Sequence, residues 1–138
     1  MGEPRRVRLL LDTHIWIWTL LEPKRLTRGV ASRLEDPANE LWLSPISVWE
    51  TLLLAEKRRI ELDGPPFRWI VTALRDFPVR DAILTREIAG ASRSVDLPHQ
   101  DPADRFIAAS AMVYDLTLVT ADERLLRTRR YRTLPNSL

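Results

Sequence analysis

Four acidic residues stand where a strand is expected to end or a helix to begin, and together they could bind a metal. They are Asp12, Glu50, Asp104 and Asp122. Asp12 follows an apolar run with the length and continuity of a strand buried on both faces. Carboxylates gathered at the edge of a sheet can hold a divalent cation, which can activate water and bind a phosphate. The pattern therefore indicates a metal site.

Each acid also has a purely structural explanation. Asp12 can cap the helix that follows it, and Asp122 stands in a strand-to-helix turn, where Asp is common. Ser47 and Glu50 have the spacing of a capping box. Asp104 falls in the first turn of an expected helix, where the helix dipole favours an acid. For any single residue, the structural role is the simpler explanation.

The four acids are harder to explain structurally when they are taken together. Right-handed crossovers bring successive strand ends to one edge of a parallel sheet, which would place Asp12 and Asp122 close to each other. Glu50 and Asp104 begin helices that return from that same edge. Clustered carboxylates without a cation would repel one another and raise each other's pKa, and a hard cation removes that conflict. With no cysteine and no paired histidines, the ligand set favours Mg²⁺ or Mn²⁺ over zinc.

The elements that must position these acids alternate between strands and helices along the whole chain. Strands are expected at 7–11, 41–44, 77–79 and 116–120, with an edge strand near 131–134. Helices are expected at 14–21, 27–34, 47–58, 66–75, 81–92, 102–114 and from 123. This alternation predicts one α/β domain over residues 1–138 with a central, mainly parallel sheet.

Composition is that of an ordinary globular protein. The chain has 138 residues, enough for one core, with 45% hydrophobic and 29% charged residues. No apolar run approaches the roughly 20 residues that span a bilayer, and no signal-peptide core follows the charged start. The absence of cysteine excludes a disulfide framework and a thiolate nucleophile. We therefore expect a cytoplasmic protein without membrane contact.

Arginines crowd the end of the chain although the net charge is only +2. Basic clusters can neutralise phosphates, but they also form ordinary solvated faces. The sequence alone leaves the role of this segment open. Its arginines are Arg124, Arg127, Arg129, Arg130 and Arg132.

Four segments, in this order, resemble the PIN-domain family, and in particular its VapC-like toxin ribonucleases. They are Leu-Leu-Asp-Thr-His at 10–14, Ser-Val-Trp-Glu at 47–50, Asp-Pro-Ala-Asp-Arg at 101–105 with the small-residue helix after it, and Val-Thr-Ala-Asp at 119–122. The resemblance runs from residue 7 to about residue 131. The third and fourth segments in combination are its most specific part.

The resemblance implies a three-layer α/β/α domain and a Mg²⁺- or Mn²⁺-dependent endoribonuclease that hydrolyses RNA phosphodiester bonds. Its acidic quartet, which would bind the metal and carry catalysis, maps onto Asp12, Glu50, Asp104 and Asp122. The residues that would orient the quartet or hold a metal-bound water are Thr13, Asp101 and Thr120. Two alternatives remain open: an inactive RNA-binding or scaffold PIN domain, and an aspartyl-phosphate phosphatase or receiver-like domain. The second alternative requires an acid where this chain has His14.

The same resemblance implies partners. A free ribonuclease of this kind would damage its own cell, so we expect a small antitoxin protein in addition to the RNA substrate. The apolar surfaces of segments 15–18 and 48–54 exceed what one sheet face can cover. Part of them is expected to form the antitoxin groove or a homodimer contact, and the remainder is expected to be core.

Overall fold

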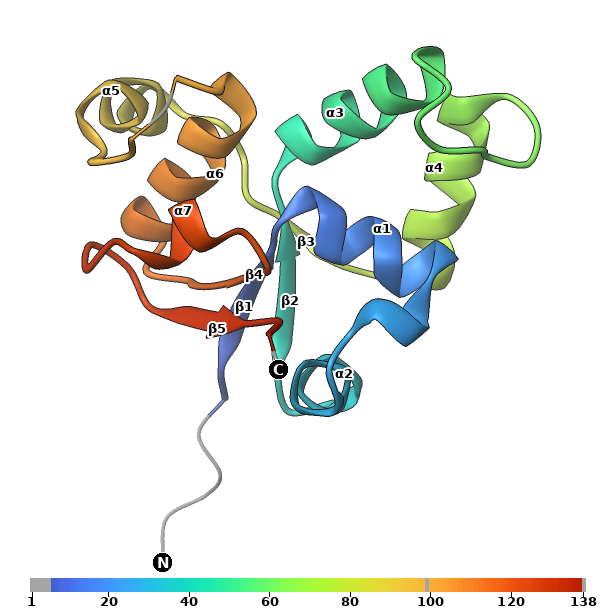
Figure 1. Cartoon of the computed structure of the whole chain (residues 1–138), viewed down its shortest axis with the longest axis horizontal. Coiled ribbons are helices and arrows are strands. Elements are labelled where there is room, and N and C mark those ends of the chain that lie inside the picture. Colours follow the sequence, from blue (N-terminus) through green and yellow to red (C-terminus); the bar gives the residue numbers. More distant parts are fainter. Residues whose placement is uncertain (1–5, 99, 138) are drawn as a thin grey trace, which may run out of the picture.

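The computed structural model describes residues 6–98 and 100–137, and a five-stranded sheet lies at its centre (Figure 1). The strand order is β3-β2-β1-β4-β5, and every neighbouring pair is parallel. The strands are β1 (Arg8–Leu11), β2 (Glu40–Leu43), β3 (Arg80–Asp81), β4 (Thr117–Thr120) and β5 (Thr133–Pro135). The predicted parallel α/β sheet is therefore confirmed.

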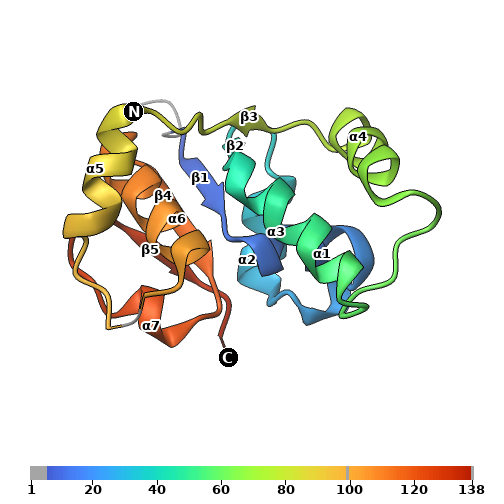
Figure 2. The ribbon, with the colours of Figure 1, turned by 90° about the horizontal axis from the view of Figure 1, so that it is seen from above.

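Helices cover both faces of the sheet and give the molecule three layers (Figures 1 and 2). On one side lie α1 (Thr13–Leu21), α2 (Arg28–Glu35), α3 (Pro45–Glu56) and α4 (Pro66–Asp76), with a short 3-10 turn at Pro23–Arg25. On the other side lie α5 (Arg86–Ser94), α6 (Pro102–Val113) and α7 (Glu123–Leu126). Among the described residues, no helix is long and apolar enough to cross a membrane.

The central strand β1 is buried on both faces, as its continuous apolar sequence predicts. Leu10 packs into a core with α6 residues such as Ile107 and Ala108. Leu9 and Leu11 point to the opposite face and pack with residues of α1 and α2. One strand thus contributes to both cores, and this fixes its register against its two neighbours.

Two boundaries between residues 77 and 94 differ from the sequence prediction. The strand expected at 77–79 lies at Arg80–Asp81, and its pairing continues where the backbone N–H of Ala82 donates to the carbonyl of Leu43 over 2.9 Å. Asp81 therefore belongs to β3 and does not cap a helix. Helix α5 begins only after Thr85, whose hydroxyl accepts from the backbone N–H of Ile88. Pairing with the edge of the sheet thus placed Asp81 in a strand, although the local sequence favoured a helix cap at this residue.

The central place of β1 in the strand order determines where a ligand can bind. The chain passes from β1 to β2 on one side, whereas β4 pairs with the other side of β1. Strands that diverge in this way leave a crevice beyond their carboxyl ends, where ligands of open α/β sheets bind. The residues that follow β1 and β4 are Asp12 and Ala121-Asp122.

Candidate active site

Asp12 lies directly after β1 and is 7% exposed. Its backbone N–H donates to the carbonyl of Val119 over 3.0 Å, which continues the β1–β4 pairing. Its Oδ1 accepts from the backbone N–H of His14 over 2.8 Å and caps α1, while its Oδ2 accepts from the hydroxyl of Thr120. Burial raises the pKa of Asp12, and these hydrogen bonds offset part of the rise. The expected capping role is real, yet it uses only one of the two carboxylate oxygens.

Asp122 is the second residue after β4, and its side chain caps α7. Its Oδ1 accepts from the backbone N–H of Arg124 over 2.9 Å. Its own backbone N–H donates to the hydroxyl oxygen of Thr120 over 3.0 Å. The buried Thr120 side chain therefore bridges the residues that follow the two strands, as a group that orients carboxylates should.

Glu50 lies one turn further into its helix than the sequence indicated. Helix α3 begins at Pro45, and the Ser44 hydroxyl caps it by accepting from the backbone N–H of Ile46 over 3.1 Å. The expected helix start at Ser47 is therefore wrong, and so is the capping-box explanation of Glu50. Ser47 is buried inside the helix, where it accepts from the Thr13 hydroxyl over 2.9 Å. Proline at the first helical position explains the earlier start. The structural explanation for Glu50 is thereby removed.

The start of α6 supplies two further acids. Asp101 caps the helix and accepts from the backbone N–H of Asp104 over 3.0 Å. Partial burial, reinforced by the negative charges of Asp101, Asp12, Asp122 and Glu50, raises the pKa of Asp104 to about 7. Partial burial raises the pKa of Glu50 as well, and the nearby Thr13 hydroxyl opposes that rise. Burial is the larger cause of both shifts, and the repulsion expected of clustered carboxylates without a cation adds to it.

Arg105, which the sequence offered only as part of a motif, positions the start of α6. Its guanidinium is buried and donates to backbone carbonyls at the end of α5, to Ser92 over 2.8 Å and to Val95 over 3.0 Å. A cation at the carboxyl end of a helix is favoured by the helix dipole. Arg105 thus joins α6 to α5 and does not point into the acidic site.

One crevice of about 520 Å³ brings the predicted acids together. It is lined by Asp12, Glu50, Asp101, Asp104 and Asp122, with His14, Trp18, Arg25, Ala121 and Arg124 completing its walls. The remaining predicted residues, Thr13 and Thr120, are buried. Thr120 donates to Asp12, and Thr13 donates to Ser47 on the helix that carries Glu50. The residues predicted from the sequence therefore lie in or next to one crevice.

Arg124 is the residue of this crevice whose role the sequence did not reveal. Its Nη2 lies 2.9 Å from Oδ2 of Asp122 and 3.8 Å from Oδ2 of Asp104. The hydrogen bond and charge of Asp122 raise the pKa of the guanidinium further. Its spacing two residues after a capping Asp is the only sequence signal, and the surrounding run of arginines conceals it. Arg124 supplies positive charge to a site of five acids.

The donor set fits a hard divalent cation in its chemistry. All the candidate ligands are carboxylate oxygens, which Mg²⁺ and Mn²⁺ prefer. Among the described residues, however, no three acidic or histidine side chains are close enough together to enclose an ion. The carboxylates stand apart, and Arg124 bridges two of them. Binding a cation would therefore require small side-chain movements and competition with this guanidinium.

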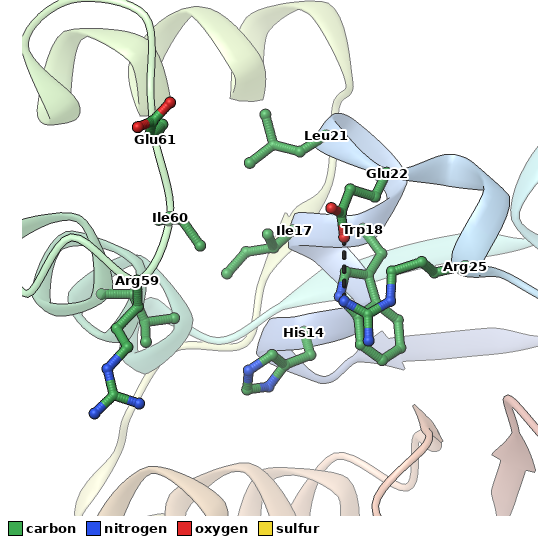
Figure 3. Close-up of a pocket in the computed structure, with 10 residues that line it drawn as sticks. His14, Ile17, Trp18, Leu21, Glu22, Arg25, Arg59, Ile60 and Glu61 are labelled. Atoms are coloured by element: carbon green, nitrogen blue, oxygen red, sulfur yellow. Dashed lines mark hydrogen bonds and ion pairs between the residues drawn. The ribbon is translucent and has the colours of Figure 1, made fainter.

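A second depression of about 570 Å³ adjoins the acidic crevice and shares His14, Trp18 and Arg25 with it (Figure 3). The guanidinium of Arg25 lies over the Trp18 ring, 4.3 Å from its centroid, and forms an ion pair with Glu22. The apolar part of the wall comes from α1, from the end of α3 and from the segment after it. Its residues are Ile17, Leu21, Leu54 and Ile60.

Comparison with known proteins gives consistent results. The family model described as "PIN domain" matches residues 9–131. Over 127 residues the chain is 37% identical to ribonuclease VapC22 of Mycobacterium tuberculosis, covering 90% of this chain and 94% of that protein.

Solved structures share the fold at lower sequence identity. A chain of VapBC2 from Rickettsia felis, crystallised with a DNA fragment from its promoter, has a TM-score of 0.64 and 15% identity, covering 95% of this chain and 100% of that one. A chain of DNA-bound VapBC from Salmonella typhimurium has a TM-score of 0.65 and 20% identity, covering 95% and 99%. These likenesses confirm the predicted three-layer α/β/α architecture.

Proposed function

The chain belongs to the PIN-domain family, and from this premise we propose that it is a divalent-cation-dependent endoribonuclease, the toxin of a toxin–antitoxin pair. One observation carries the proposal: acids from β1, α3, α6 and the β4–α7 turn line a single crevice at the carboxyl edge of the sheet. The 37% identity to ribonuclease VapC22 supports the substrate class. RNA is therefore the proposed substrate and Mg²⁺ or Mn²⁺ the proposed cofactor.

Asp12, Glu50, Asp104 and Asp122 are the residues that we propose as metal ligands and catalytic groups. A bound cation would supply a water of lowered pKa and would stabilise negative charge on the scissile phosphate. The chain's own part is to hold the carboxylates in position: Thr120 donates to Asp12, and Thr13 stands beside Glu50. Asp101 would contribute through hydrogen bonds from the rim of the crevice.

The alternatives from other classes have less support. An inactive scaffold domain would have no reason to keep a half-buried Asp104 whose pKa is raised to about 7 by burial and by the neighbouring acids. An aspartyl-phosphate phosphatase or receiver-like domain would need an acid in place of His14, which begins helix α1 beside the crevice.

The depression next to the acidic crevice is where we propose that the antitoxin binds. It combines an apolar wall, which suits an amphipathic helix, with direct continuity to the carboxylates. A basic side chain of an antitoxin bound in this depression could reach into the acidic crevice and occupy the position of the cation. The solved neighbours include a chain of VapBC from Salmonella typhimurium and a chain of a toxin–antitoxin complex from Klebsiella pneumoniae.

The expected division of the aromatic helix between core and groove agrees with its burial. Ile15 and Trp16 are fully buried, whereas Trp18 lines the depression. On α3 and α4, Trp49 is 50% exposed and Phe67 is 61% exposed. We propose this exposed apolar surface as the homodimer contact, separate from the antitoxin site.

The decisive experiment uses the chain purified free of antitoxin and stripped of metal with EDTA. We expect RNA cleavage to return on addition of Mg²⁺ or Mn²⁺, and Asp104→Asn to stay inactive under the same conditions. Attack by water predicts products with 5′-phosphate ends, which ligation-based sequencing of the fragments detects. Cleavage that persists in EDTA, or that survives in Asp104→Asn, would contradict the proposal.

A further inference from the structure

The arginine-rich segment after α7 forms a basic surface of its own, with a depression of about 530 Å³. Its walls are Arg124, Arg127, Arg129 and Arg130, together with Asp96, Pro98 and Thr128. The sequence alone left this segment between a phosphate-binding role and an ordinary solvated face. Four arginines around one concavity give it a positive charge that would attract an anion.

The backbone of this segment is fixed although its basic side chains are exposed. The buried Tyr131 donates its hydroxyl to the carbonyl of Leu125 over 2.8 Å, which holds the segment against α7. The Thr128 hydroxyl accepts from the backbone N–H of Arg130 over 3.1 Å, and the carbonyl of Arg132 accepts from Leu118 over 2.8 Å. The guanidinium groups therefore project from a rigid base, which lowers the ordering cost of binding a ligand.

Some arginines elsewhere in the chain form internal contacts, whereas those of this segment do not. Arg6 and Arg80 pair with Glu40, and Arg8 donates to carbonyls at the end of α6. Within residues 6–98 and 100–137, no carboxylate lies within ion-pair distance of Arg127, Arg129 or Arg130. Asp96 shares the depression but forms no ion pair with them. The side chains are thus available for an external anion.

Arg124 connects this depression with the proposed active site. It lines both concavities, and its guanidinium lies 2.9 Å from Asp122. A polyanion whose reactive phosphate sat at the carboxylates would have its flanking phosphates within the arginine depression. The depression proposed for the antitoxin shares only His14, Trp18 and Arg25 with the crevice. The two depressions next to the crevice therefore have no lining residue in common.

We propose that Arg127, Arg129 and Arg130 bind backbone phosphates of the single-stranded RNA on one side of the bond to be cleaved, with Arg124 at the boundary. This inference rests on the proposed ribonuclease function and adds the direction in which the substrate leaves the active site. Phosphate contacts of this kind position the strand without reading its sequence.

The test measures binding of a short, fluorescently labelled single-stranded RNA to the full chain in EDTA, by anisotropy at several salt concentrations. The variant is Arg127→Gln/Arg129→Gln/Arg130→Gln. The matched control removes three exposed arginines of α2 and α4, Arg28→Gln/Arg33→Gln/Arg68→Gln, which line none of the three depressions. A single-stranded contact contributes a slope of about −0.7 per phosphate to the logarithm of affinity against that of salt.

We expect the variant to bind RNA at least tenfold more weakly and to flatten the salt slope by about 2, from three lost contacts. The control should keep the slope and lie within about twofold of wild type in affinity. Replacing the same three residues by lysine should restore most of the slope, because lysine keeps the charge. Equal losses in variant and control, an unchanged slope in the variant, or no salt-dependent binding by wild type would each overturn the proposal.

Two parallel measurements separate this inference from the proposed function. If wild type cleaves RNA with Mg²⁺ while the triple variant binds and cleaves like the control, the inference fails and the ribonuclease remains. If wild type never cleaves RNA, the proposed function fails, and the salt slope still decides whether the arginine-rich segment binds RNA. If the triple variant no longer captures the antitoxin but keeps the salt slope of RNA binding, the arginine-rich segment contacts protein, and the proposal is overturned. Unchanged melting curves check that the variant folds.

Discussion

The hydroxyl of Thr120 donates a hydrogen bond to the buried carboxylate of Asp12, across the two central strands of the sheet. The same oxygen accepts from the backbone N–H of Asp122. A carboxylate removed from water needs such a donor to stay ionised, because burial alone raises its pKa. One threonine therefore opposes the rise that burial causes in the pKa of Asp12, and it fixes the direction in which this carboxylate faces the crevice.

Thr120→Val should impair both stability and cleavage. The substitution keeps the shape but removes the donor, and a lost hydrogen bond to a charged group costs about 1.5–3 kcal/mol. The pKa of Asp12 should rise further, so that metal binding weakens at neutral pH. Thr120→Ser, which retains the hydroxyl, serves as the control in denaturant unfolding and in RNA cleavage. Equal behaviour of the valine and serine variants would show that the hydrogen bond has no role.

Asp104→Asn should abolish cleavage and stabilise the metal-free protein near neutral pH. The pKa of Asp104 is raised from 3.8 to about 7 in the fold, so the folded state binds its proton more tightly than the unfolded state. Stability then falls as pH rises between these two values. One pKa unit corresponds to about 1.4 kcal/mol, so at least about 1 kcal/mol should be lost by wild type over this range.

The measurement compares melting curves of wild type and Asp104→Asn in EDTA between acid and neutral pH. Their difference should grow with pH and level off above neutrality, because the asparagine does not titrate. Excess Mg²⁺ or Mn²⁺ should reduce the difference, since a cation offsets the repulsion among the acids. A difference that is independent of pH would mean that Asp104 is not strained by its neighbours.

Glu50→Gln should leave stability nearly unchanged and reduce cleavage by an order of magnitude or more. Since Ser44 caps α3, Glu50 has no capping duty, and the neutral amide should relieve repulsion at the site. Ser44→Ala is the complementary variant: loss of the cap should cost about 1 kcal/mol without altering cleavage chemistry. Unfolding curves and initial rates of both variants test the assignment. A stable and fully active Glu50→Gln would exclude Glu50 from the metal site.

Strand β1 and helix α3 show what the sequence could and could not predict. The buried run before Asp12 fixed the central strand, and the alternation of elements predicted the sheet edge where the acids meet. The start of α3 was misplaced because Ser44-Pro45 and Ser47 are both good starting signals. Choosing between them requires knowing that Ser47 is buried against Thr13, which is a tertiary contact.

Arg124 was beyond sequence reasoning for a related physical reason. In a chain with 21 basic residues, no pattern distinguishes the guanidinium that enters an acidic crevice from those in solvent. That placement follows from how the short helix α7 turns after Asp122.

Arg124→Gln should tighten binding of Mn²⁺ in the absence of RNA. The guanidinium contacts carboxylate oxygens of Asp122 and Asp104 that a cation would use. It is half-exposed, and solvent screens such ion pairs strongly, so we expect a gain in affinity of only about two- to fivefold by calorimetry. Arg127→Gln removes the same charge outside the crevice and should change affinity less. Weaker Mn²⁺ binding by Arg124→Gln would show that this residue supports the metal site instead of competing for it.

Leu21→Arg should separate antitoxin binding from RNA cleavage. Leu21 lines the depression in Figure 3 and is 37% exposed, so arginine fits without disturbing the core. A charged side chain on the apolar wall should weaken capture of the antitoxin at least tenfold, because central apolar contacts dominate such interfaces. Cleavage by the free protein should be unchanged, and co-expressed antitoxin should no longer protect the cell. Ile83→Arg, at an exposed apolar residue that lines none of the three depressions, is the control and should leave capture intact. If Leu21→Arg captures antitoxin as well as that control does, the inhibitor binds elsewhere on the molecule.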